Sequence, residues 1–243
     1  MRSALVTGAS RGIGHGIALQ LARDGFGLTV TSRSRADLAK AAEELVAAGA
    51  PEVTHIAADL ADRESLLAVA DLHRECFGSM DALVLSGGVG TAGALHSIDL
   101  RRADKTVAVN FMSAVTLVRA ALPALRAAGA ASPHGARVIV LSSITGAYAE
   151  PGLAVYGATK AALLSLAESL SAEEGHNGVL ATAVAPAYVA TDMSAWAADR
   201  IDPSAMIPVS DVVAVVRMLL QLGRNTSIPR IVLARSGTSG YQA

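Results

Sequence analysis

The sequence predicts an α/β protein with one doubly wound, mostly parallel sheet of seven strands and helices on both faces, in a single domain covering residues 1–243. Two observations indicate this class. Short β-branched or aliphatic runs alternate with longer Ala- and Leu-rich segments, the pattern of parallel strands joined by crossover helices. The length of 243 residues, without internal repeats or charge runs, fits one large domain.

Seven runs are expected to form the strands, because near-continuous aliphatic residues are typical of strands buried on both faces. They are Ser3–Thr7, Leu28–Thr31, Val53–Ala57, Ala82–Leu85, Arg137–Leu141, Val179–Val184 and Arg230–Leu233. Six longer segments between them are expected to form helices. They are Gly12–Asp24, Ala36–Ala48, Asp62–Phe77, Leu100–Ala127, Val155–Glu174 and Ser210–Leu222.

The helical segments differ in how clearly the sequence marks them. The first has apolar residues every four positions and a glycine at its end, which predicts one buried stripe. The segment Leu100–Ala127 contains Asn110 and Pro123, and either is a candidate break. The stretch Ala127–Gly135, rich in Ala and Gly, is expected to be a surface loop.

Composition excludes several classes of function. Lys plus Arg (20) almost balance Asp plus Glu (21), so no basic stripe is available for a nucleic-acid backbone or an acidic membrane surface. Aromatic residues make up only 3%, which disfavours base stacking. The six His show no metal-ligand spacing. We therefore expect no nucleic-acid partner, no membrane partner and no metal site.

Location is predicted from cysteine use and hydropathy. Cys76 is the single cysteine, which excludes an intrachain disulfide and fits a reducing compartment. The longest charge-free windows, Ala82–Ile98 and Gly175–Thr191, are too short and too polar to span a bilayer. The first residues do not form a secretory signal. A cytoplasmic protein is expected.

A glycine-rich turn follows the first strand, reading Thr7-Gly-Ala-Ser-Arg-Gly-Ile-Gly14. Gly8 permits a sharp turn, Gly12 lets backbone amides approach a pyrophosphate, and Gly14 lets the helix pack against the strand. A phosphate is favoured at the helix N-terminus by free N–H groups and the helix dipole. The turn predicts a Rossmann-type dinucleotide site, although an ordinary strand-to-helix turn is the alternative reading.

The end of the second strand indicates which dinucleotide. Thr31-Ser-Arg-Ser-Arg35 has no acid where a ribose 2′-hydroxyl would be gripped. Arg33, joined by Arg11 from the glycine turn, has the guanidinium geometry to hold a 2′-phosphate. The predicted cofactor is NADP(H), and the alternative is that Arg33 and Arg35 are solvated turn residues.

A tyrosine and a lysine four residues apart, Tyr156 and Lys160, are expected on one helix face. A phenol ordinarily titrates near ~10, and a neighbouring ammonium would lower its pKa toward neutrality against the opposing effect of burial. Ser142 and Ser143 follow the fifth strand, at the sheet edge where such folds bind ligands. Either serine suits a hydrogen bond to a carbonyl oxygen, although each is also a common turn residue.

Together these motifs resemble the short-chain dehydrogenase/reductase family over nearly the whole chain, from Ala4 to about Leu233. Besides the glycine turn, the motifs in family order are Ala58-Asp59-Leu60, Asn110, Ser143 and Tyr156-Gly-Ala-Thr-Lys160. The resemblance implies a reductase in which Tyr156 is the general acid, or base in oxidation, and Ser143 holds the substrate oxygen. It also implies that Lys160 lowers the Tyr156 pKa and holds the nicotinamide ribose, while Asn110 positions a water.

The same resemblance supplies the remaining contacts. Asp59 would face the adenine, and the Pro186–Thr191 loop would orient the nicotinamide amide. The predicted cofactor-binding residues are Gly8, Ser10, Arg11, Gly12, Ile13, Gly14, Ser32, Arg33, Asp59, Leu60, Ser86, Gly87, Gly88, Tyr156, Lys160, Pro186, Val189 and Thr191.

Three segments depart from the family pattern. Leu85-Ser-Gly-Gly88 replaces the usual Asn-Asn-Ala-Gly, so the strand-stabilising asparagine contacts are expected to be lost. Pro186-Ala187 replaces Pro-Gly, which restricts the backbone if a positive φ is needed. The carboxyl-terminal segment from Arg230 to Ala243 lacks the frequent Asp-Gly-Gly ending.

The predicted function is NADP(H)-dependent hydride transfer between nicotinamide and a carbonyl or secondary alcohol, a 3-oxoacyl thioester or another ketone being candidate substrates by resemblance. A catalytically silent NADP(H) sensor or scaffold is the alternative, and a nucleotide-dependent methyltransferase is a weaker one. A homodimer or homotetramer is expected through the two longest helices.

Three groups of residues are candidates for contacts with the substrate. A loop at about residues 187–208, with Met193, Trp196 and Met206, is expected to cover the pocket or simply to pack on the core. Further contacts are expected from Gly93, Leu95 and His96. Four arginines are candidates for facing an acidic carrier or for being solvated charges, namely Arg101, Arg102, Arg119 and Arg126.

Overall fold

The computed structural model describes residues 1–239; the last four positions of the departing carboxyl-terminal segment, Gly240–Ala243, lie outside the described residues. The fold is one seven-stranded sheet in the order β3-β2-β1-β4-β5-β6-β7, with every neighbouring pair parallel. The strands are β1 Ser3–Thr7, β2 Gly27–Ser32, β3 Val53–Ala57, β4 Ala82–Leu85, β5 Ala136–Leu141, β6 Val179–Pro186 and β7 Arg230–Leu233. The predicted doubly wound α/β fold is confirmed.

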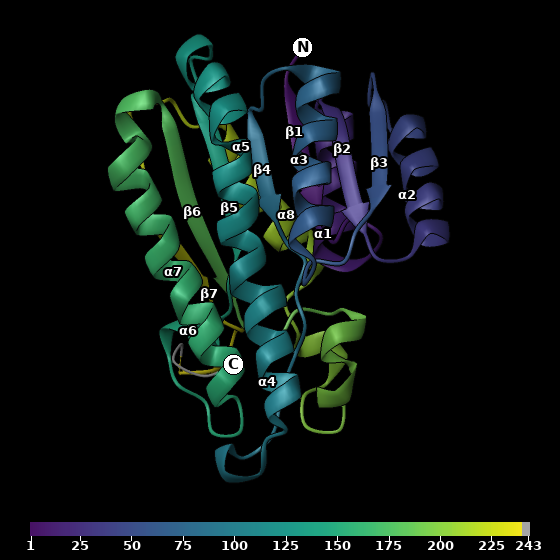
Figure 1. Ribbon diagram of the computed structural model, residues 1–243. Helices are drawn as coiled ribbons and strands as arrows, with labels where there is room; N and C mark the ends of the chain where they lie inside the picture. The colour runs from purple at the N-terminus through teal and green to yellow at the C-terminus, as the bar shows by residue number, and fades with distance from the viewer. Residues whose placement is uncertain (240–243) are drawn as a thin grey trace.

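Helices cover both faces of the sheet (Figure 1). The α-helices are α1 Gly12–Arg23, α2 Arg35–Ala47, α3 Arg63–Phe77, α4 Leu100–Val107, α5 Ser113–Ala131, α6 Ile144–Ala147, α7 Ala154–Glu174 and α8 Val209–Gln221. Five short helical segments join them, namely η1 Leu95–Ser97, η2 Ala108–Met112, η3 Gly175–Asn177, η4 Asp192–Ala197 and η5 Pro203–Ala205.

Two hydrophobic clusters hold the layers together. On one face, α1, α2 and α8 bury side chains such as Ile17, Leu45 and Leu219 against the sheet. On the other, α3, α5 and α7 bury side chains such as Leu117 and Leu163. The inner strands are buried on both sides, which explains why their sequences are mostly aliphatic.

The segment Leu100–Ala131 forms one helical run, which corrects two expectations. Neither candidate position breaks it: Pro123 lies inside α5, and Asn110 lies in η2, a π-helical turn that widens the helix locally. The helix also covers the first part of the Ala- and Gly-rich stretch predicted to be a loop, as far as Ala131, whereas residues 132–135 form a turn as expected. Gly129 in this last part of the helix packs closely on a neighbouring turn, because a Cβ there would lie 2.4 Å from the carbonyl oxygen of Asn177.

By length and composition alone, Leu100–Ala131 would be long and apolar enough to cross a membrane. The segment contains charged residues, so it is not one of the charge-free windows of the sequence. In the structure it packs as a core helix, with Leu117 and Leu125 fully buried against the sheet layer. Packing within one domain therefore accounts for its apolar character.

Candidate active site

A cavity of about 1190 Å³ lies at the carboxyl edge of the sheet, where the ends of β1, β2, β4, β5 and β6 converge. Every residue predicted to bind the cofactor lines it, from Gly8 to Thr191, as do Ser143, Tyr156 and Lys160. Asn110 lies just behind the wall and is buried.

The glycine turn is closely packed against β4. Gly8 and Gly12 have φ values of +65° and +60°, which only glycine adopts without strain. A Cβ at Gly14 would lie 2.4 Å from the Gly8 carbonyl oxygen, and one at Gly8 would lie 2.9 Å from Gly87 Cα. The sharp turn predicted at Gly8 and the close helix packing predicted at Gly14 are therefore present.

The N-terminus of α1 opens into this cavity without a side-chain cap, since Arg11 at the N-cap makes no capping hydrogen bond and the first turn holds no acid. Unsatisfied amides at a helix N-terminus favour a phosphate. The residues present therefore fit a dinucleotide pyrophosphate.

The end of β4 lacks the family's asparagine contacts, as expected, and Ser86 and Gly87 make other contacts there. Its hydroxyl donates to the Thr7 carbonyl oxygen, and the backbone amides of Ser86 and Gly87 donate to Thr7 Oγ1, each at 3.1 Å. Three hydrogen bonds thus join the ends of β1 and β4. The serine and threonine hydroxyls replace longer amide side chains over the same junction.

The arginines near the second strand have different surroundings. Arg33 lines the cavity and, within residues 1–239, forms no ion pair. Arg35 does not line the cavity and begins α2. Arg11 also lines the cavity, but its Nη1 is 3.2 Å from Asp192 Oδ2. It therefore pairs with the loop at about residues 187–208, called the substrate loop below, and is not free to join Arg33.

Ser143, Tyr156 and Lys160 lie together at the centre of the cavity. Ser143 Oγ accepts hydrogen bonds from Thr145 N at 3.3 Å and Thr145 Oγ1 at 3.0 Å, as the N-cap of α6, a helix that sequence patterning missed. Lys160 Nζ is 5.5 Å from the centroid of the Tyr156 ring. The predicted one-face relationship of the pair is present.

The electrostatics differ from the expectation for Tyr156. Burial raises the pKa of the phenol, and the hydrogen bond with Ser143 opposes that shift in part. Burial also lowers the pKa of Lys160 to about 8. The lysine therefore does not depress the tyrosine pKa in the protein alone, because removal of water from both groups dominates.

The side chain of Asn110 is hydrogen-bonded to residues behind the cavity wall. Its Oδ1 accepts from Val89 N at 2.8 Å, and its Nδ2 donates to Val89 O at 3.0 Å and to Thr159 Oγ1 at 3.3 Å. Both amide hydrogens are used, so only the second lone pair of Oδ1 remains for the expected water. The side chain fixes the segment after β4.

The substrate loop begins on a regular backbone. Ala187 has no positive φ, and its amide donates to Leu233 O at 2.8 Å, so the exchange of glycine for alanine introduces no strain. Met193 and Trp196 line the cavity and are 52% and 54% exposed, whereas Met206 is buried in the core. Of the two alternatives for this loop, Met193 and Trp196 follow the first and line the cavity, and Met206 follows the second and packs on the core.

The wall after β4 also differs from expectation. Gly90, Thr91 and Ala92 line the cavity, whereas Gly93, Leu95 and His96 do not. The chain turns outward at Gly93, whose amide donates to Gly152 O at 2.8 Å. Among residues 1–239 no cluster of His, Cys, Asp or Glu could hold a metal ion.

Comparison with known proteins identifies the family of this chain. A family model described as short chain dehydrogenase matches residues 2–201. The chain belongs to the short-chain dehydrogenase family. Its members are oxidoreductases acting on CH–OH and C=O groups, which removes the methyltransferase alternative.

Individual relatives agree with this family assignment. The chain is 31% identical over 231 residues to the 3-oxoacyl-[acyl-carrier-protein] reductase FabG of Staphylococcus aureus, covering 95% of this chain and 89% of the relative. It is 33% identical over 203 residues to the oxidoreductase UcpA of Escherichia coli, covering 83% and 74%. Among solved structures, an alcohol dehydrogenase from the archaeon Thermococcus sibiricus complexed with 5-hydroxy-NADP superposes with a TM-score of 0.87 at 28% identity, covering 100% of this chain and 98% of that one.

Proposed function

We propose that this short-chain dehydrogenase transfers hydride between NADP(H) and a carbonyl or secondary alcohol, with Tyr156 as the general acid or base. The observation that carries the proposal is the placement of Ser143, Tyr156 and Lys160 in the same cavity as the glycine turn. A bound nicotinamide supplies or accepts the hydride. The chain's own residues must then hold the substrate oxygen and move its proton.

In reduction, Tyr156 gives its hydroxyl proton to the developing alkoxide, and Ser143 donates a hydrogen bond to the same oxygen. Tyr156 is protonated in the resting site because burial raises its pKa, which suits a proton donor. Lys160 lies close enough to stabilise the phenolate that remains after transfer.

NADP(H) is proposed over NAD(H) because Arg33 lines the cavity without a protein partner in residues 1–239, as a 2′-phosphate ligand would. The Thermococcus sibiricus relative, solved with 5-hydroxy-NADP, supports this choice. The remaining predicted contacts, including Asp59 and Leu60 toward the adenine, are part of the same proposal.

The substrate class is proposed from the loop that covers the cavity and from the relatives. Met193 and Trp196 present apolar surface, which suits a ketone or 3-oxoacyl thioester with an apolar body. The Staphylococcus aureus relative is named as a 3-oxoacyl-[acyl-carrier-protein] reductase. We further propose a cytoplasmic homodimer or homotetramer, with no nucleic-acid or membrane partner.

The test is consumption of NADPH, with NADH in parallel, against a panel of 3-oxoacyl thioesters, ketones, quinones and keto sugars, using Tyr156→Phe as the control. NADPH-selective turnover that is lost in Tyr156→Phe supports the proposal. Saturable NADPH binding without turnover across the panel would instead indicate a cofactor sensor or scaffold.

A further inference from the structure

One wall of the cavity is formed by a single face of the helical run made by α4 and the start of η2. Arg102, Lys105 and Val109 follow one another at helical spacings of three and four residues, and all three line the cavity. Thr106, in the same helix, is buried and its hydroxyl contacts that of Thr91, which orients the helix relative to the segment after β4. The side chains of Arg102 and Lys105 therefore place two positive charges at the cavity wall.

The charge on this face is not neutralised by the protein. Within the described residues neither Arg102 nor Lys105 forms an ion pair, even though Asp104 lies between them in sequence. Other arginines do find carboxylates: Arg126 is bidentate to Glu174 at 2.6 and 2.8 Å, and Arg217 contacts Asp24 at 2.8 Å. Arg102 and Lys105 differ from these arginines in lining the cavity without a carboxylate partner in the described residues.

The cofactor is not expected to occupy this wall. The glycine turn and Arg33 provide for its phosphates from the ends of β1 and β2, whereas α4 follows β4 and projects beyond the carboxyl ends of the strands (Figure 1). Across the cavity the substrate loop presents Met193 and Trp196. A ligand there meets cationic surface from α4 and apolar surface from the loop.

We propose that the substrate of this enzyme carries an anionic group, a phosphate or a carboxylate, which Arg102 and Lys105 bind while its carbonyl lies at Tyr156. This inference rests on the proposed function and narrows its substrate class. Arg119 and Arg126, two other candidates for facing an acidic carrier, are excluded from the role because neither lines the cavity. Lys105 was not a candidate from sequence, since only its place on the helix face reveals it.

The test compares substrates that share a reacting ketone and differ in charge. Acetoacetyl-coenzyme A and the neutral acetoacetyl N-acetylcysteamine thioester form the phosphate arm, and levulinate and methyl levulinate form the carboxylate arm. In the wild type we expect KM to be at least about tenfold lower for the anionic member of one pair. In Arg102→Ala/Lys105→Ala the ratio of the two KM values should fall to about one.

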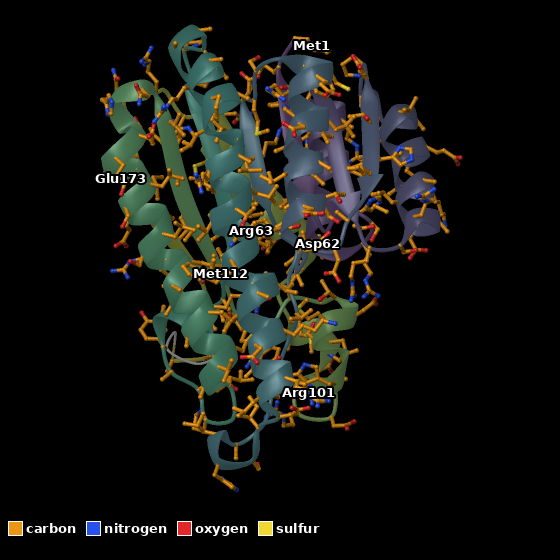
Figure 2. All side chains as sticks on the ribbon, viewed as in Figure 1. Met1, Asp62, Arg63, Arg101, Met112 and Glu173 are labelled. Carbon is orange, nitrogen blue, oxygen red and sulfur yellow. The ribbon has the colours of Figure 1, made fainter. Side chains whose placement is uncertain are left out.

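The matched control is Arg101→Ala, which removes one positive charge from the same helix at an exposed position outside the cavity lining (Figure 2). It should keep the wild-type ratio of KM values. A ratio near one in the wild-type enzyme for both pairs, or an equal loss in Arg101→Ala, would overturn the proposal.

A second measurement needs no turnover. Calorimetric titration of coenzyme A and of levulinate into enzyme saturated with NADP⁺, which blocks the nucleotide site, should show binding that weakens about tenfold or more in the double variant. The Kd for NADPH should not change. If no carbonyl is reduced but the anions still bind through Arg102 and Lys105, the proposed function fails while the anion site stands; if ketones are reduced and no anion binds, the reverse holds.

Discussion

Lys160 Nζ donates a 2.8 Å hydrogen bond to the carbonyl oxygen of Leu141, the last residue of β5. The end of β5 therefore fixes the ammonium group in place. The distance from Lys160 Nζ to the centroid of the Tyr156 ring is 5.5 Å. In the proposed mechanism, a lysine held in this way acts on the phenol of Tyr156 through its charge, and Tyr156 transfers the proton.

Tyr156→Phe removes the proton donor and leaves the ring in place. We expect turnover to fall by about 10²–10⁴-fold or more, in the range of general acid catalysis, with the Kd for NADPH within a few fold of wild type. Steady-state NADPH oxidation and fluorescence titration measure the two quantities. Substantial turnover in the variant would contradict the assignment.

Arg33→Glu should reverse the charge opposite the 2′-phosphate. We expect the preference for NADPH over NADH in kcat/KM to fall by at least about tenfold, since a charge-assisted bond is replaced by repulsion. Arg35→Glu is the matched control, because Arg35 lies two residues away and does not line the cavity. Equal effects of the two substitutions would show that the cause is general charge and not a phosphate contact.

Gly14→Ala should destabilise the fold and the cofactor site together. The added Cβ would meet the Gly8 carbonyl oxygen at 2.4 Å, which forces the glycine turn away from α1. We expect a loss of about 1–3 kcal/mol in the free energy of unfolding, measured by urea denaturation, and weaker NADPH binding. Gly223→Ala, with open space around its Cβ, should show neither effect.

The pair Arg126–Glu174 predicts a pH dependence of stability. Hydrogen bonds from Arg126 and Asn177 lower the pKa of Glu174 from 4.5 to about 2. A carboxylate with a depressed folded-state pKa stabilises the fold above its unfolded pKa and loses that contribution as pH falls toward the folded value. Glu174→Gln should therefore cost about 1 kcal/mol at pH 7, and the difference from wild type should vanish between about pH 4.5 and 2.

Glu173→Gln is the control for this experiment, since Glu173 is exposed and, in residues 1–239, has no ion pair (Figure 2). Equilibrium unfolding across this pH range measures both variants. A Glu174→Gln difference that stayed constant down to pH 2 would refute the ionic origin of the stabilisation.

The sheet could be predicted almost residue by residue, because a strand buried on both faces must be a short aliphatic run and helices must separate parallel strands. The end of α5 around Gly129 could not be predicted. A row of small residues is typical both of loops and of helices that pack closely on a neighbouring turn. The same limit applies to Ser86, whose hydroxyl reaches Thr7 only because two distant strand ends meet.

The candidate site was predictable where motif residues sit on strand ends or in the glycine turn. It was not predictable where neighbouring elements decide the outcome: burial sets the direction of the Tyr156 pKa, and the partners of Asn110 come from Val89 and Thr159. Lys105 likewise enters the cavity only through the rotation of α4.

The substrate loop is joined to itself at its base, where Val189 pairs with Ile207 in a parallel bridge and the Ile207 amide donates to Tyr188 O at 2.9 Å. Both ends of the loop are thus anchored to one place on the sheet edge, and the intervening residues make a closed excursion. We therefore expect the residues between Val189 and Ile207 to be replaceable by those of a relative with the same anchor residues, with a change in which substrates enter and no disturbance of the strands beneath.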